Sequence, residues 1–161
     1  DLTDSSEIHI MRPTTVICML IAFIATGSLN AQHVYPEKFD NCYLDEFKFE
    51  ETSIIAEIED KVLTQVITEG WDDKMLKKAE GYLGLQILVD RRGKSCLMSV
   101  RNDTNMKLKK MKLNENIDNN LKWNGQEDKI SVIVLLQFEG DQITVKRLGT
   151  TDMVNLVEIK E

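Results

Sequence analysis

The residue types that carry most enzyme chemistry are sparse in this sequence of 161 residues. Beyond its first 31 residues it has one histidine, His33, and two cysteines, Cys42 and Cys96. A catalytic triad would depend on His33, which lies in a polar segment ahead of the first predicted element. A zinc site would need more ligands than these three residues supply, and their spacing matches no standard zinc motif. We therefore expect a protein that is not an enzyme and that uses no metal or cofactor.

Carboxylates are the remaining candidates for acid–base chemistry. Glu50 and Glu51 are neighbours, as are Glu59 and Asp60. Side chains one residue apart on a helix do not face each other, so these pairs favour a solvated surface over an acid–base site. The sequence also lacks the Gly-x-Ser-x-Gly, phosphate-loop and dinucleotide motifs. A small secreted hydrolase or ligand-binding domain, with a site that has no sequence signature, stays the alternative.

The two later cysteines leave two interpretations open. In an oxidising compartment, Cys42 and Cys96 could form a disulfide that closes a loop of 54 residues. The chain-entropy estimate for such a loop is about 4 kcal/mol of stabilisation. Alternatively, both are buried thiols, since Cys96 lies in an alternating apolar pattern where a small apolar residue fits.

Charge is unevenly distributed along the chain. Lys and Arg number 20 against 27 Asp and Glu, a net charge of −7, which argues against a nucleic-acid binder. Residues 91–112 are nevertheless rich in bases, and five of them form a candidate basic patch for an anionic partner or membrane surface: Arg91, Arg92, Lys94, Lys109 and Lys110. The alternative is that these bases are solvated or pair with the acidic segment 37–60.

The amino-terminal residues have the pattern of a signal peptide. Met11 and Arg12 precede an apolar run, 16–25, and small and polar residues lead to Ala31. We expect cleavage near Ala31 and a periplasmic or secreted protein whose contact with membranes is at most peripheral. An uncleaved anchor is the alternative, although the run is shorter than the ~20 residues of a typical transmembrane helix. Residues 1–10 are interpreted as a mis-assigned start or a cloning remnant.

The elements that would position these residues can be read from apolar periodicity. Residues 32–50 look like a polar lead with a short strand at most, and residues 51–161 form the domain. A helix is predicted over 53–69, capped by Thr52 or Ser53 and ended by Gly70. Alternating residues predict a hairpin with strands 83–89 and 96–100, a second helix over 113–121, and strands 130–138 and 142–148, with a further short strand within 153–159. This order predicts a two-layer α+β fold, a small antiparallel sheet packed against two helices.

Residues 81–140 resemble the C-terminal domain of TonB-type energy transducers. The shared features are a strand, an Asp-x-x-Gly-Lys turn at 90–94, a return strand, a helix, Trp123 shortly after it, and a last strand. The sequence departs from the family before the hairpin and after the helix, where Trp71-Asp72 and Trp123-Asn124 replace proline-containing pairs. The resemblance implies an exported module that stands alone and takes a partner strand on a sheet edge.

We therefore expect a non-catalytic module that binds an envelope protein or peptide by strand addition, with no fixed expectation for its oligomeric state. One candidate edge is 95–100, with Ser95, Leu97 and Ser99 on it, and the other is 142–148. Trp71 and Trp123 are candidate anchors for the partner. The alternative for both tryptophans, and for Met98, is a place in the core.

Overall fold

The computed structural model describes residues 33–160, which form a mixed α+β fold in two layers. The sheet runs in the order β1 (Glu37–Lys38), β4 (Ser95–Thr104), β3 (Glu80–Val89), β5 (Ile130–Glu139), β6 (Gln142–Gly149) and β7 (Val157–Glu158). These neighbours are antiparallel, whereas β2 (Lys48–Phe49) pairs in parallel with the start of β5. The predicted fold class is confirmed. The expected signal peptide and residues 1–10 lie outside the described residues.

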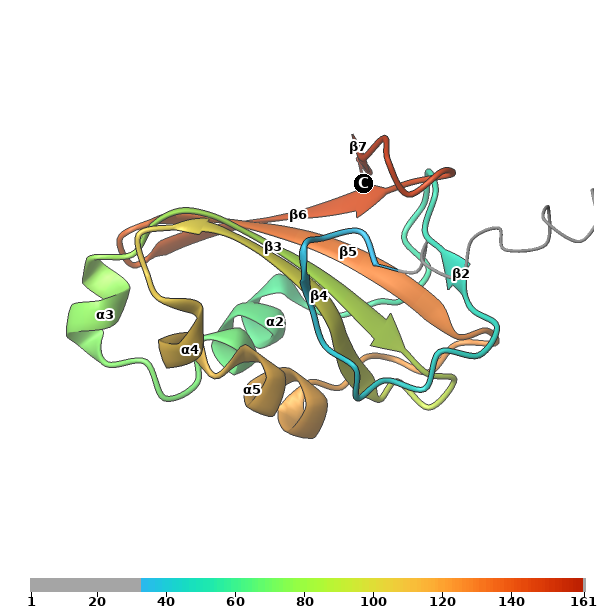
Figure 1. Ribbon diagram of the computed structural model, residues 1–161, viewed down its shortest axis with the longest axis horizontal. Helices are drawn as coiled ribbons and strands as arrows, with labels where there is room; N and C mark the ends of the chain where they lie inside the picture. Colours follow the sequence, from blue (N-terminus) through green and yellow to red (C-terminus); the bar gives the residue numbers. More distant parts are fainter. Residues whose placement is uncertain (1–32, 161) are drawn as a thin grey trace, which may run out of the picture. The chain divides into compact units, whose positions relative to one another are not determined.

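Helices cover one face of the sheet (Figure 1). They are α2 (Asp60–Ile67), α3 (Asp73–Lys77), α4 (Leu108–Met111) and α5 (Leu113–Asn120). Alternation along β3 points Leu83, Leu85 and Ile87 toward this layer, where they join one core with Leu63 of α2 and Ile117 of α5. β5 lies between β3 and β6, the central position that its apolar sequence predicts, and most of its side chains are buried.

The turn between β3 and β4 follows the sequence prediction. The carboxylate of Asp90 accepts hydrogen bonds from the backbone N–H groups of Arg92 and Lys94, both at 2.8 Å. Gly93 has φ +79°, and a Cβ at this position would lie 2.1 Å from the backbone oxygen of Trp123. Only glycine fits both the left-handed backbone and this close approach. The turn is therefore held against the chain segment that follows α5.

The first helix is shorter than its apolar pattern predicts. α2 begins at Asp60 and not at residue 53. The backbone N–H groups of Ile55 and Ala56 donate to the Glu50 carboxylate, at 2.7 and 3.0 Å, and this segment takes an irregular path. Gly70, with φ +78°, follows the end of α2 as expected. The two short helices α3 and α4 were not predicted, and Asp72 caps α3 by accepting from Met75 N–H at 2.7 Å.

The lead at residues 33–50 is an integral part of the sheet. β1 pairs with β4 and β2 pairs with β5, so the lead holds two short strands where the sequence predicts one at most. On the sheet face opposite the helices, the Val34 N–H donates to the Gln86 side chain at 2.8 Å, and the Tyr35 ring packs against Gly84. Burial raises the pKa of the Tyr35 hydroxyl to about 12, with Arg101 opposing the shift. The lead thus covers polar groups that would otherwise face solvent.

Candidate functional site

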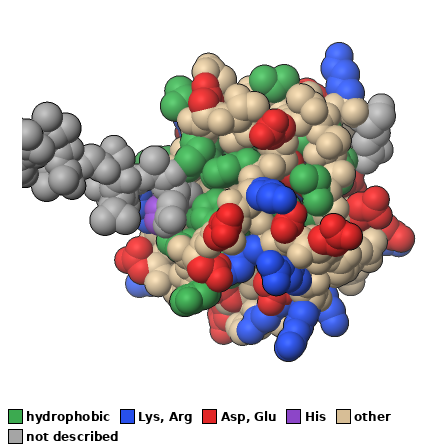
Figure 2. Space-filling model, turned by 90° about the vertical axis from the view of Figure 1, so that its right-hand side faces the viewer, with side chains coloured by type: hydrophobic (Ala, Val, Ile, Leu, Met, Phe, Trp, Pro, Cys, Tyr) green, Lys and Arg blue, Asp and Glu red, His purple; other side chains and the backbone are tan. Residues whose placement is uncertain are grey.

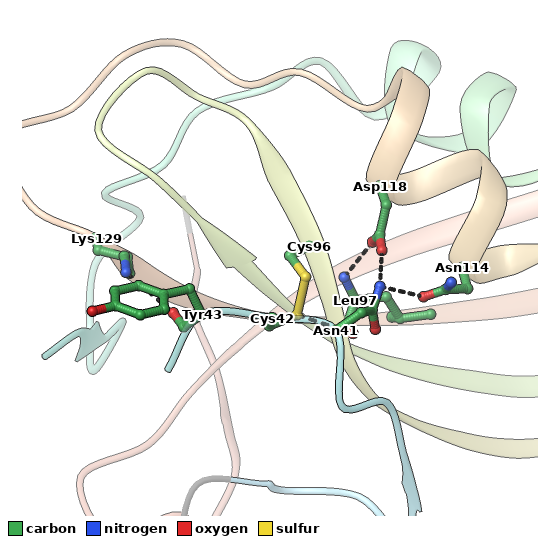
Figure 3. The surroundings of a disulfide bond; sticks show 8 residues. All are labelled: Asn41, Cys42, Tyr43, Cys96, Leu97, Asn114, Asp118 and Lys129. Carbon is green, nitrogen blue, oxygen red and sulfur yellow. Dashed lines mark hydrogen bonds between the residues drawn. A yellow bond between two sulfur atoms is a disulfide. The ribbon is translucent and has the colours of Figure 1, made fainter. Parts of the chain in front are cut away.

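Cys42 and Cys96 form a disulfide, the first of the two interpretations that the sequence left open. Their Cα atoms lie 5.7 Å apart, within the usual range for such a bond. The bond ties the lead to the second residue of β4, and Figure 3 shows the Leu97 backbone directly beside it. The Cys42 sulfur lies 3.3 Å from the Leu97 carbonyl oxygen, a contact and not a hydrogen bond, because a disulfide sulfur carries no proton.

The sheet edge at residues 95–100 is closed by the chain itself. Phe39 N–H donates to the Met98 carbonyl at 3.0 Å, and Glu37 and Lys38 of β1 pair opposite Val100 and Ser99. The Leu97 N–H donates to the carboxylate of Asp118 on α5 at 2.6 Å (Figure 3). The expectation of an open partner edge here is therefore wrong. The residue that closes it from α5, Asp118, has no signal in the sequence that links it to β4.

The side chains proposed for that edge are also buried. Ser95, Leu97 and Ser99 are each at most 2% exposed. The Ser95 hydroxyl accepts from the Trp123 indole N–H at 2.8 Å, and the Ser99 hydroxyl donates to Gln86 at 2.7 Å. These serines satisfy buried polar groups of the fold and are not presented to a partner.

Asp118 lies half-buried beside the disulfide. Its second carboxylate oxygen accepts from the Asn41 side chain, which also contacts Asn114 (Figure 3). Burial raises the pKa of Asp118, and the hydrogen bonds from Leu97 and Asn41 and the nearby charge of Lys94 oppose this shift. Both oxygens are thus occupied by groups that hold the lead and β4 in place. We assign Asp118 a structural role at this edge.

The two tryptophans belong to the core and are not surface anchors. Trp71 is 8% exposed, stacks on Phe138 with ring centroids 5.6 Å apart, and donates its indole N–H to the Met111 carbonyl at 3.1 Å. Trp123 is 3% exposed and lies under the Arg147 guanidinium at 5.0 Å. Met98 is fully buried as well. The core alternative holds for all three residues.

The five bases of the candidate patch do not form one surface. Arg91, Arg92 and Lys94 lie in the turn before β4, whereas Lys109 and Lys110 lie on α4, beyond the other end of that strand. A strand of ten residues is roughly 30 Å long. Around the turn, Arg91 and Arg92 share a hollow with Asp45 and Glu46. Figure 2 faces this end of the molecule and shows basic and acidic side chains intermixed there. The prediction of a single basic patch is therefore wrong.

A buried ion pair joins two residues that the sequence reasoning did not connect. The Arg147 guanidinium donates to the Glu50 carboxylate at 2.5 Å and to the Ala56 carbonyl at 3.0 Å. The Arg147 side chain is 8% exposed and that of Glu50 is fully buried. Because Glu50 also binds the Ile55 and Ala56 N–H groups, the pair fastens residues 50–56 to β6. No sequence pattern could reveal it, since the partners are 97 residues apart.

β6 carries the open edge of the described sheet. The Arg147 carbonyl accepts from Ile159 N–H at 2.9 Å, on the side of β7 and away from β5. Backbone groups alternate along an antiparallel strand, so those of Val145 and Ile143 also point away from β5. β7 pairs only with Leu148 and Gly149, and no other described strand reaches Ile143 and Val145. Their side chains are partly buried against the core.

A cleft beside Arg147 of β6 is lined by three acidic and two basic side chains, the bases being Lys122 and Arg147. It has a volume of about 610 Å³ and is lined by Ile58, Val62, Arg147 and three carboxylates, Glu57, Glu59 and Asp60, among others. The three carboxylates are exposed to solvent. Within residues 33–160, no group of three His, Cys, Asp or Glu side chains is placed to hold a metal ion.

No protein-family model, curated protein sequence or solved structure matches this chain. The resemblance to TonB C-terminal domains therefore stays a prediction from the sequence. In the described part of the chain, none of the helices has both the length and the apolar character needed to cross a membrane.

Proposed function

We propose that this protein is a non-catalytic interaction module that binds an extended peptide of another protein by strand addition along β6. The observation that carries the proposal is the unpaired edge at Ile143 and Val145, where two N–H and two C=O groups point away from the sheet. A peptide strand that pairs there would satisfy these groups and cover two half-exposed apolar side chains. Proteins usually protect such edges, and in this sheet the edge at β4 is protected.

The setting of the edge supports a partner outside the reducing cytoplasm. A disulfide fastens the lead across the other edge, and disulfides of this kind persist in oxidising compartments. The signal-peptide pattern of residues 11–31 and the resemblance to TonB C-terminal domains point the same way. We therefore place the module in the periplasm or outside the cell, with an envelope protein as its partner.

The experiment selects linear peptides from a display library on the full chain and then measures hydrogen exchange with a selected peptide. Binding should slow exchange of the Ile143 and Val145 amides. Val145→Lys should abolish binding, because a lysine on the edge obstructs strand pairing. The matched control is Val154→Lys, which adds the same charge at an exposed loop residue and should bind normally.

Two outcomes would overturn the proposal. One is a bound peptide that leaves the two edge amides unprotected. The other is that every selected peptide still binds to Val145→Lys, or that no peptide is selected at all. A second copy of the chain pairing through β6 would appear as a dimer that dissociates on dilution and is lost in Val145→Lys. That result would replace peptide capture with self-association.

A further inference from the structure

A second cleft, independent of the β6 edge, lies between α3 and the start of α4. Figure 1 places these two short helices at the same end of the sheet. The cleft has a volume of about 550 Å³, within the range of small-molecule sites. Four lysines line it: Lys74 and Lys78 from the α3 side, and Lys107 and Lys110 from the α4 side. Half-buried Met75 and Met106 also contribute to its lining.

The local structure explains why these lysines converge. Lys74 and Lys78 are four residues apart and share a face of the α3 segment, and Lys107 and Lys110 are three apart at α4. The side chain of Asn105 joins the two segments. It donates to the Lys78 carbonyl at 2.6 Å and accepts from the Glu80 N–H at 3.1 Å. The spacing of the two lysine pairs is thus fixed by hydrogen bonds and does not depend on the lysines themselves.

The charge of this cleft is not balanced by the described residues. None of the four lysines forms an ion pair within residues 33–160, whereas Lys48, Lys129 and Lys146 each do. The carboxylate in the lining, Asp72, is engaged in capping α3 through the Met75 N–H. Four lysines and one carboxylate therefore line one concave surface, a net charge of +3, in a chain whose net charge is −7.

We propose that this cleft binds a ligand that carries two phosphate groups close together. Lysines act as point charges with three donors each and suit tetrahedral anions that accept bonds from several directions. Two adjacent phosphates carry enough negative charge to offset the net positive charge of this lining. The lysines converge on an open hollow from two helices, which favours a discrete phosphorylated group over a general attraction to anionic surfaces. That group is either a free molecule or the headgroup of a lipid.

The test titrates the full chain with inorganic pyrophosphate at low ionic strength, by calorimetry and by amide chemical shifts. Saturable binding is expected, with shifts at Lys74, Lys78 and Lys107–Lys110. Lys74→Gln with Lys110→Gln should weaken binding about tenfold or more, because half of the donors are lost. The matched control is Lys77→Gln with Lys109→Gln, which removes the same charge from the same helices outside the cleft and should change binding less than about twofold.

A second arm separates the two sources of phosphate. Vesicles of phosphatidylcholine with phosphatidic acid are sedimented with the protein, with and without pyrophosphate. Vesicle binding that pyrophosphate displaces, and that the cleft double variant loses, assigns the site to a lipid headgroup. Pyrophosphate binding without vesicle binding assigns it to a soluble ligand. Equal loss in the cleft and control double variants, or no saturable binding of pyrophosphate, would overturn the proposal.

Discussion

At the scale of single residues, the Glu50–Arg147 pair is the most consequential contact that the structure adds. Both side chains are almost entirely withdrawn from solvent. We expect Glu50→Gln to lower the free energy of unfolding by about 3 kcal/mol, because it leaves the guanidinium buried without its counter-ion. Glu50→Gln with Arg147→Met should lose much less than the sum of the two single variants. Urea unfolding of the four proteins measures this coupling, and additive losses would contradict it.

Asp118 gives a prediction for pH. Burial raises the pKa of the folded carboxyl above its ordinary value of 3.8, so the folded state binds its proton more tightly than the unfolded state does. The contribution of this group to stability therefore falls as the pH rises from near 3.8 through the raised value. We expect the free energy of unfolding of the wild type to fall relative to that of Asp118→Asn over this window. Urea unfolding at a series of pH values tests the sign, and a constant difference would refute it.

At the scale of elements, the disulfide determines how firmly the lead is held on β4. Cys42→Ser with Cys96→Ser should lower the free energy of unfolding by about 4 kcal/mol, the chain-entropy value for a loop of 54 residues. In the folded variant, the Phe39 amide should exchange faster, because the lead beside its bond to Met98 is then no longer tied covalently to β4. The control compares the Phe39 exchange rate of the wild type before and after reduction of its disulfide. Unchanged exchange at Phe39 would show that the lead is held without the disulfide.

The elements also show which parts of the fold are accessible from sequence. The hairpin of β3 and β4, the helix α5 and the pair β5 and β6 follow from local alternation, spacing and turn residues. The start of α2 does not, because Glu50, which Arg147 binds from β6, accepts hydrogen bonds from the N–H groups of Ile55 and Ala56. The pairing of Glu37 with Val100 likewise depends on contacts distant in sequence. The open edge expected at 95–100 is wrong for this reason, whereas the strand expected at 142–148 is present because it follows from local alternation.

At the scale of the whole molecule, the two edges of the sheet differ in how far their backbone groups are paired. Proline substitutions can measure this difference. β4 is covered by the lead and by Asp118, whereas no strand within residues 33–160 pairs with Ile143 and Val145 on the outer side of β6. The outward N–H of Val145 has no bond to lose, so Val145→Pro should cost less than about 1 kcal/mol.

Thr144→Pro removes an N–H that points toward β5 and should cost about 3 kcal/mol or more. Leu97→Pro should be comparably damaging, because it removes the donor to Asp118. Urea unfolding of the three variants ranks them. If Val145→Pro is as damaging as Thr144→Pro, the β6 edge is already engaged within the chain and strand addition there fails. If it is tolerated, the same variant becomes the cleanest way to block peptide binding without unfolding the protein.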